Sequence, residues 1–458
     1  MASTWIKRDL SVSETVYKYT WSAWIKRTGL GVAGDLFKTR IDGNNWVQAY
    51  LHSNNRLVLQ SYKNGGYHYD FMTTRAFRDT FGWYHFVFNV DSSQSSASDR
   101  VRIYVNGERI TEFSTSNNNL TNGDSLIING SDSGQAHTIG SWNNGSYFEG
   151  LMSHVHYSSG YSYDPTTFGS TDSTTGEWKI NTSPNFTLGG NGYSVLKDGI
   201  TITDQSSNSN DFTVGGGTLT KTEDCPSNVF CTINILDKAP ISFSLANGAT
   251  TLNDSGSADN DNGIKATMGV NSGKYYWEMK KGSGSGGVHA IVTEDVDVRL
   301  GNRATSSPAS GLWGFQSNGS SAPLVSYING TFDSTGNTLQ GWGANDIIGF
   351  ALDMDNGKLY LSKNGTFYGL DGNSSDPANA TNPAITGIPT GDKFVFPYFE
   401  KRSADSPETM CNFGNGFFGT SAITSNSGNG YAADGSLGIF QYQPPTGYTA
   451  LCTKGLNQ

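Results

Sequence analysis

The residues best suited to catalysis are few and poorly placed. The densest group of carboxylates is Glu294–Asp297 (EDVD). Catalytic acid and base groups must be positioned around a substrate. A contiguous acidic run instead predicts a solvated turn or strand edge. His154 and His156 would share one face of a strand, but no third ligand is nearby in the sequence. We expect them, like His85, to be structural. Gly215–Gly217 lacks the Lys-Ser/Thr pair of a phosphate-binding loop.

The four cysteines leave two alternatives open. They are Cys225, Cys231, Cys411 and Cys452, and none belongs to the CxxC pair of a zinc site. Cys225 and Cys231 are six residues apart around Pro226, so a disulfide could close a small loop. Alternatively, all four are reduced and partly buried, because the cytosol keeps thiols reduced.

Sugar binding has better support than catalysis. It needs aromatic faces together with amide and carboxylate groups on loops. Trp142 lies in GSWNNGSY with Asn143, Asn144 and Tyr147, and Trp46 lies in DGNNWVQ. These five residues are the candidate ligand-binding set; the alternative is that Trp142 covers a sandwich core. Four other tryptophans are expected in core strands: Trp24, Trp83, Trp277 and Trp313.

The elements that must position these residues are strands. In YTWSAWIKR, Trp21, Ala23 and Ile25 alternate with polar residues, which is the pattern of a half-buried strand. Asn106-Gly107 and Asn364-Gly365 predict hairpin turns. No segment keeps a helical period, so we expect under roughly a tenth of helix against a usual ~30–35%. Further strands are predicted at 57–62, 83–90 and 100–105.

Composition agrees with β structure and narrows the function. The 458 residues include 57 Gly and 12% aromatic but only 15% charged residues, and Gly suits tight turns while aromatic residues suit sheets. The net charge of −10 argues against nucleic-acid binding. No apolar run of about 18 residues predicts a membrane span. Met1–Leu10 lacks the apolar core of a signal peptide, so we expect synthesis in a cytosol without export by the usual route.

Clusters of Pro, Thr, Ser and Gly divide the chain. We expect a β-sandwich at 1–165, a connector with short strands at 166–238, a second β-sandwich at 239–420 and an extended tail at 421–458. The tail should dock on a neighbouring surface, because the prolines at 444–445 lower the entropy cost of ordering an extended segment.

The first part resembles the laminin-G-like, concanavalin-A-like sandwich. The residues that carry the resemblance are YTWSAWIK (19–26), GWYHFVFNVD (82–91), VRIYVNGERI (101–110) and HTIGSWNNGSYFEGLMSHVHYSSG (137–160). The resemblance covers about residues 15–165 and implies a jelly roll of two antiparallel sheets.

The second part resembles a SPRY domain, which is also a two-sheet sandwich. The residues that carry it are GKYYWEMK (273–280), DIIGFALDMDNGKLYLSKNGTFYG (346–369) and MCNFG (410–414). The expected fold class is therefore all-β, with two tandem antiparallel β-sandwiches and an irregular connector.

Further stretches resemble structural proteins of tailed phages. DQSSNSNDFTVGGG (204–217) and DCPSNVFCTIN (224–234) are similar to a connector in such proteins, although Cys225 and Cys231 stand where Thr is expected. FQYQPPTGYTALCT (440–453) is similar to the tail that follows their SPRY unit. The resemblance implies a virion protein that is made in the host cytoplasm.

The resemblance to laminin-G-like and concanavalin-A-like sandwiches also bears on catalysis and metals. Glycosidases of this kind use a Glu-x-Asp-x-Glu run, which is absent, so we expect no enzyme activity. Some laminin-G-like units hold calcium through Asp, Asn and loop carbonyls. Asp35, Asp42 and Asn44 are the corresponding candidates, and ordinary turn chemistry is the alternative. No other cofactor is expected.

The expected function is adhesion by a surface protein of a tailed-phage virion, on a tail fibre, a tail appendage or the capsid. The expected partners are other virion proteins and a host surface glycan, within a homo-oligomer and without nucleic acid or membrane insertion. A neutral glycan is favoured because the chain is acidic. One alternative is a capsid-decorating, particle-building protein with no host ligand; a less favoured one is a glycan-degrading enzyme.

Overall fold

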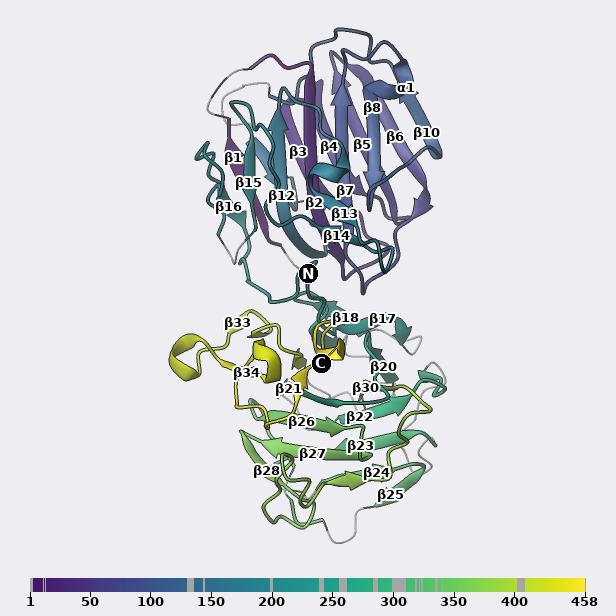
Figure 1. Ribbon diagram of the computed structural model, residues 1–458, viewed down its shortest axis with the longest axis vertical. Helices are drawn as coiled ribbons and strands as arrows, with labels where there is room; N and C mark the ends of the chain where they lie inside the picture. Colours follow the sequence, from purple (N-terminus) through teal and green to yellow (C-terminus); the bar gives the residue numbers. More distant parts are fainter. Residues whose placement is uncertain are drawn as a thin grey trace. The chain divides into compact units, whose positions relative to one another are not determined.

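The protein consists of two β-rich compact units, 1–221 and 222–458 (Figure 1). The computed structural model describes residues 3–10, 12, 14–129, 136–142, 145–197, 201–238, 243–254, 262–282, 287–298, 310–317, 319–320, 322, 324–333, 337–339, 341–401 and 408–457. Strands make up 49% and helices 4% of the structure, which confirms the all-β class and the tandem sandwiches. Among the described residues, no helix has the length and apolarity needed to cross a membrane.

Unit 1 (residues 1–221) is built from two antiparallel sheets that enclose an apolar core. The eight-stranded sheet has the order β10 (Phe113–Asn118), β6 (Gly66–Ala76), β5 (Arg56–Lys63), β4 (Asn45–Leu51), β3 (Gly34–Asp42), β11 (Ala136–Ile139), β1 (Trp5–Asp9), β16 (Thr213–Gly216). The six-stranded sheet has the order β15 (Tyr193–Val195), β12 (Gly150–Ser159), β2 (Lys18–Arg27), β7 (Tyr84–Asp91), β8 (Val101–Val105), β9 (Glu108–Arg109). Outside the two sheets lie the short helices α1 (Ala97–Arg100) and η1 (Pro165–Thr167) and the hairpin of β13 (Gly169–Thr171) and β14 (Trp178–Ile180).

Strand β2 shows how the alternating pattern becomes the core. Trp21, Ala23 and Ile25 are buried in the core between the sheets, as the sequence predicts. Ser22, on the opposite face, is also buried, because the segment after β12 folds back over the six-stranded sheet. Trp178 of β14 donates a hydrogen bond to His85 Nδ1 at 3.0 Å, and His85 Nε2 lies 2.8 Å from Ser22 Oγ.

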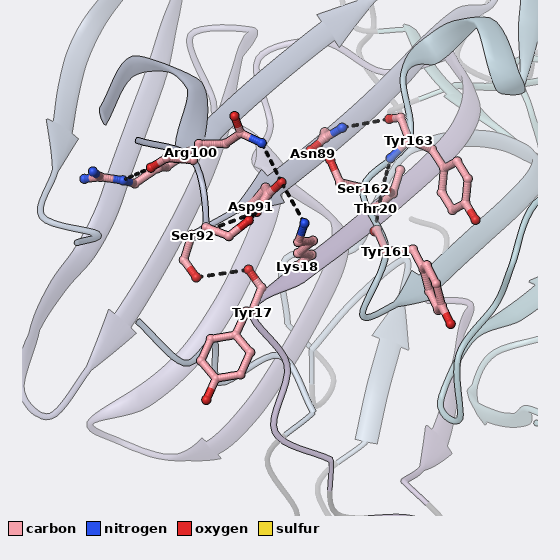
Figure 2. Close-up of polar contacts among 12 residues, drawn as sticks. Tyr17, Lys18, Thr20, Asn89, Asp91, Ser92, Arg100, Tyr161, Ser162 and Tyr163 are labelled. Carbon is pink, nitrogen blue, oxygen red and sulfur yellow. Dashed lines mark hydrogen bonds and ion pairs between the residues drawn. The ribbon is translucent and has the colours of Figure 1, made fainter. Parts of the chain in front are cut away.

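One end of the six-stranded sheet is fixed by a polar network (Figure 2). Asn89 donates to the carbonyl of Tyr163 at 2.8 Å, and the Lys18 ammonium lies 3.5 Å from Asp91. Figure 2 shows the rings of Tyr17 and Tyr161 pointing away from these contacts. The network therefore joins β2 and β7 to the backbone of the covering segment.

The stretch 204–217 belongs to unit 1 and is tied to its first strand. Arg8 of β1 donates to Asn210 Oδ1 at 2.8 Å, and the Asp204 carboxylate accepts the N–H groups of Ser206 and Asn210. Strand β16 then pairs with β1, and a Cβ at Gly215 would lie 2.5 Å from the Trp5 ring. Glycine is required there because the indole packs directly on the backbone.

Unit 2 (residues 222–458) is also a two-sheet sandwich. One sheet has the order β17 (Ile233–Lys238), β20 (Asn262–Ala266), β30 (Val395–Lys401), β22 (Val288–Thr293), β23 (Leu312–Gln316), β24 (Val325–Ile328), β25 (Thr331–Asp333). The other has the order β18 (Phe243–Ala246), β19 (Thr251–Asp254), β31 (Thr409–Asn412), β21 (Lys274–Lys281), β26 (Ile347–Asp353), β27 (Lys358–Lys363), β28 (Thr366–Tyr368), with β29 (Ile385–Thr386) paired to β27 and β36 (Thr449–Ala450) paired to β21. Smaller elements are the hairpins β32 (Phe417–Phe418) with β33 (Ser421–Ala422) and β34 (Tyr431–Ala433) with β35 (Leu437–Phe440), and the turns η3 (Asn426–Gly428), η4 (Asp434–Ser436) and η5 (Gly455–Asn457).

The core residues and turns of unit 2 follow the sequence pattern. Trp277 stacks on Phe350 with ring centroids 5.5 Å apart. Asn364-Gly365 has φ values of 50° and 86° between β27 and β28, so the predicted hairpin is confirmed. The four tryptophans expected in core strands, Trp24, Trp83, Trp277 and Trp313, are all buried. Trp24, however, stacks on His85 on the outer face of β2, and Trp83 lies just before β7. All four cysteines are free thiols, so no disulfide joins Cys225 and Cys231.

The C-terminal segment docks on unit 2, as its prolines predict. Strand β36 pairs in parallel with Tyr275 and Tyr276 of β21. The buried carboxylate of Glu278 accepts the backbone N–H groups of Gln441 and Tyr442, both at 2.8 Å. The segment therefore completes the sandwich as an integral part of it.

Candidate functional site

A row of aromatic rings crosses the outer face of the eight-stranded sheet. On β4, Val47 and Ala49 point into the core, so Trp46 points outward. Cross-strand pairing places Trp46 opposite Tyr62 of β5, and Tyr62 opposite Tyr67 of β6. Trp46 and Tyr62 stack at 5.4 Å between centroids, and Tyr67 stands edge-on to Tyr62 at 5.2 Å. Together Trp46, Tyr62 and Tyr67 form what we call the aromatic row.

A second row of polar side chains runs beside it on the same face. Lys38 lies opposite Gln48, Gln48 opposite Gln60, and Gln60 opposite Asp70 of β6. Lys38 Nζ donates to Gln48 Oε1 at 3.2 Å, and Gln60 Nε2 donates to Asp70 Oδ1 at 2.8 Å. With a strand spacing of about 4.8 Å, the polar row from β3 to β6 is roughly 14 Å long and the aromatic row from β4 to β6 is roughly 10 Å long. We call the two rows and Trp142 the platform.

Trp142 extends the platform over β3. It follows β11, and its ring centroid lies 5.4 Å from Lys38 Nζ and 5.8 Å from Arg40 Cζ. Lys38 Nζ is also 5.7 Å from the centroid of Trp46. A cation over an aromatic face is attracted by the ring's quadrupole. Lys38 therefore links the two half-buried tryptophans that the sequence singles out.

Asp35 fixes the Trp142 loop to the sheet. Its carboxylate accepts hydrogen bonds from Gln48 Nε2 at 2.6 Å and from the backbone N–H of Trp142, and its own N–H donates to the Ser146 carbonyl at 2.8 Å. Burial raises the pKa of Asp35 to about 6, against the opposing effects of the Gln48 hydrogen bond and the Lys38 charge. Asp35 is thus a positioning residue for the polar row and for Trp142.

The turn before β4 places Trp46 by local chemistry. The Asp42 carboxylate accepts the backbone N–H of Asn44 at 2.6 Å and the side-chain amide of Asn45 at 3.1 Å. Such bonds to nearby backbone close an Asx-type turn, and the hydrogen bond from Asn44 is the main cause that lowers the pKa of Asp42. Trp46 then follows as the second residue of β4.

The structure brings together part of the predicted ligand-binding set. Trp46 and Trp142 meet across Lys38, and Tyr147 is half-buried in the loop that follows Trp142. Asn143 and Asn144 lie outside the described residues. Six platform residues were not predicted from the sequence, because their positions depend on the register between strands: Lys38, Gln48, Gln60, Tyr62, Tyr67 and Asp70. The hairpin signal Asn64-Gly65, between Tyr62 and Tyr67, could have paired the two tyrosines.

The calcium candidates do not meet. Asp35 and Asp42 lie at opposite ends of β3, seven residues apart, which corresponds to about 20 Å of strand. Both carboxylates accept protein N–H groups, and Asn44 donates its backbone N–H to Asp42. Within the described parts of the chain, no three His, Cys, Asp or Glu residues are grouped to hold a metal ion.

The other candidates for chemistry have structural surroundings. His156 is buried against Phe168 and Phe186, with Nδ1 2.8 Å from Ser194 Oγ. Burial lowers its pKa well below the usual value. Asp295, in the acidic run, forms an exposed ion pair with Lys393 at 2.7 Å.

Comparison with known proteins defines the class of each unit. Residues 4–161 match the family model of the Concanavalin A-like lectin/glucanases superfamily, and residues 274–380 match that of the SPRY domain. The chain thus carries a concanavalin A-like domain followed by a SPRY domain, a pair that indicates a binding or adhesion role.

Two solved structures are similar to part of the chain. They are the SPRY domain of human HERC1, at 16% identity over 39% of this chain and 96% of that one, and the TRIM65 PSpry domain, at 17% identity over 40% and 88%. The TM-score is 0.29 for both, so these similarities add nothing to the match with the SPRY family model. No curated protein matches the chain.

Proposed function

We propose that this chain is a non-enzymatic adhesion protein that binds a glycan on the outer face of its first sandwich. The observation that carries the proposal is the platform. Trp46 stacks on Tyr62, Tyr67 stands edge-on to Tyr62, Trp142 lies over β3, and amide and carboxylate groups lie beside these rings. Aromatic faces supply apolar contact to a sugar ring, and Gln side chains can both donate to and accept from hydroxyls.

The spacing of the carboxylates of Asp35, beneath the platform, and Asp70, within it, favours binding over hydrolysis. Glycoside hydrolysis uses two carboxyl groups about 5–9.5 Å apart on either side of the scissile bond. Asp35 and Asp70 are on β3 and β6, three strand spacings apart, which is roughly 14 Å. Incubation with polysaccharides should release no reducing ends. Steady release that is abolished by changing one of these two residues would refute the non-enzymatic proposal.

The proposed setting is the surface of a tailed-phage particle, with other virion proteins and a host glycan as partners. Its support is the resemblance of 204–217, 224–234 and 440–453 to segments of such proteins. Particles imaged with a labelled antibody against this chain should carry the label on the tail or the capsid. Unlabelled particles would refute the proposed location on the virion but would not affect the proposed glycan site. Labelled particles from a protein that binds no glycan would favour the particle-building alternative.

Substitution of the two platform tryptophans tests the glycan site. On an array that identifies a bound glycan, Trp46→Ala and Trp142→Ala should each weaken binding about tenfold, because a lost stacking contact of ~1.5 kcal/mol corresponds to that factor.

The matched control is Trp83→Ala, at a buried tryptophan of the same unit that lies just before β7, outside the platform. It should lower the melting temperature while the protein that remains folded binds normally. The site is misplaced if Trp142→Ala mainly unfolds the unit and leaves the folded fraction fully competent to bind.

A further inference from the structure

The centre of the platform is cationic although the chain is acidic. Lys38 and Arg40 lie on the same face of β3, two residues apart, beneath Trp142. The net charge of the whole chain is −10. General attraction to anionic polymers is therefore unfavourable, and a local pair of positive charges on a ligand-binding face needs a specific explanation.

Neither cation forms an ion pair within the described residues, although the Asp35 and Asp42 carboxylates interact electrostatically with Lys38 and Arg40, respectively. Lys38 Nζ is bonded to the neutral amide of Gln48 at 3.2 Å. Arg40 Nε donates to the backbone carbonyl of Asp42 at 3.0 Å, and its two Nη groups make no hydrogen bond to the described chain. A planar guanidinium with both Nη groups available can bind a carboxylate through two parallel hydrogen bonds.

The surroundings hold Arg40 ready for such a ligand. Its Nε bond to the turn and the Trp142 ring at 5.8 Å restrict the side chain. Arg40 lies directly opposite Trp46, so a sugar ring stacked on Trp46 would place its substituents beside the guanidinium. Lys38, two residues before Arg40 on the same face of β3, also reaches this ring, since its Nζ lies 5.7 Å from the Trp46 centroid.

We propose that the platform is selective for an acidic glycan, and that Arg40 and Lys38 bind the carboxylate of a uronic-acid unit stacked on Trp46 and Trp142. This inference rests on the proposed function of the same face and replaces the neutral glycan expected from the net charge. The global charge is an average over the molecule, whereas recognition depends on the few groups within contact distance of the ligand.

The test compares uronic-acid oligosaccharides with their carboxyl-reduced counterparts, which differ only at the charged group. Oligomers of galacturonate, glucuronate and mannuronate are titrated against the full chain, with dextran sulfate as the sulfate probe. We expect at least one acidic oligomer to bind ten or more times tighter than its reduced form and tighter than dextran sulfate. Arg40→Gln should abolish the preference, while Arg40→Lys should restore part of it.

The control cation is Arg109 of β9, in the six-stranded sheet, which forms an exposed ion pair with Asp99. Arg109→Gln should leave binding unchanged, and melting curves of all variants verify folding. The proposed selectivity for acidic glycans would be refuted if acidic and reduced oligomers bound equally, or if the Arg40→Gln variant kept the preference. Neither result would refute the glycan site itself. Tighter binding of dextran sulfate would replace the carboxylate by a sulfate ester. If neither the acidic nor the reduced oligomers bind and the glycan array is also blank, both proposals fail.

Discussion

At the scale of single residues, Glu278 is the clearest example of an ionisable group that is buried for structural reasons. Its carboxylate accepts from the backbone N–H groups of Gln441 and Tyr442, from Asn412 Nδ2 at 3.1 Å and from the Tyr276 hydroxyl at 3.2 Å. Burial raises the pKa of Glu278 to about 7, although the hydrogen bonds from the tail backbone and Asn412 oppose the shift.

This shift predicts a pH-dependent stability of unit 2. Below about pH 4.5 the carboxyl is protonated in both the folded and the unfolded chain. Between about 4.5 and 7 the unfolded chain loses the proton while the folded chain keeps it, so the free energy of unfolding falls as pH rises, by roughly 3 kcal/mol. Glu278→Gln should remove this dependence. The measurement is denaturant unfolding of unit 2 from pH 4 to 8, with exposed Glu408→Gln as the control. Parallel curves for wild type and Glu278→Gln would contradict the prediction.

Burial of single residues is predictable from the sequence where it depends on one strand, but not where it depends on the register between strands. Buried Trp21 and Trp277 follow from alternation within one strand, because period two assigns each residue to a face. Trp83 is buried too, but it precedes β7, and alternation does not account for its burial. The pairing of Trp46 with Tyr62 depends on the register between β4 and β5. A shift of one residue would move every side chain to the other face, and local pattern does not fix that choice here.

At the scale of elements, polar residues within β2 and β7 are buried by a segment distant in sequence. The pattern correctly predicts the core face of β2. On the outer side of the sheet, however, Ser22 of β2 and His85 of β7 are covered by Phe168 and Trp178. Burial lowers the pKa of His85 to about 3. Composition identifies the stretch after β12 as a break in the strand pattern, and only the folded structure shows which surface that stretch covers.

Truncation of the C-terminal segment should unfold unit 2. Deletion of 440–458 removes Phe440, Tyr448 and Leu451, which are buried and together contribute roughly 5–9 kcal/mol of apolar burial. That is comparable with the total stability of a typical domain, about 5–15 kcal/mol. The truncated chain should lose the cooperative transition of unit 2 and keep that of unit 1, as followed by calorimetry.

A shorter deletion, of 456–458, serves as the control because it removes exposed Leu456 and spares the paired strand β36. The tail would be dispensable if the long truncation melted like the full chain.

At the scale of the whole molecule, the two units have separate apolar cores. Chains 1–221 and 222–458 expressed separately should therefore each unfold cooperatively. Their far-ultraviolet circular dichroism spectra, weighted by length, should add up to that of the full chain, without strong helical minima. A unit that is soluble only with its partner would show that the cores depend on each other.

The entry and exit of unit 2 lie side by side. Cys231 donates its backbone N–H to the Leu451 carbonyl, and Thr453 donates to the Val229 carbonyl, both at 2.9 Å. A domain whose ends meet in this way can be inserted into a surface loop of another protein without separating the ends of that loop. The same closure makes unit 2 suitable for circular permutation: a short linker from 453 to 229 would conserve every strand pairing, and new termini could be opened at an exposed hairpin such as Asn364-Gly365. Unit 2 therefore has the architecture of a transferable domain, which can be inserted as one piece into other proteins by gene rearrangement or by design.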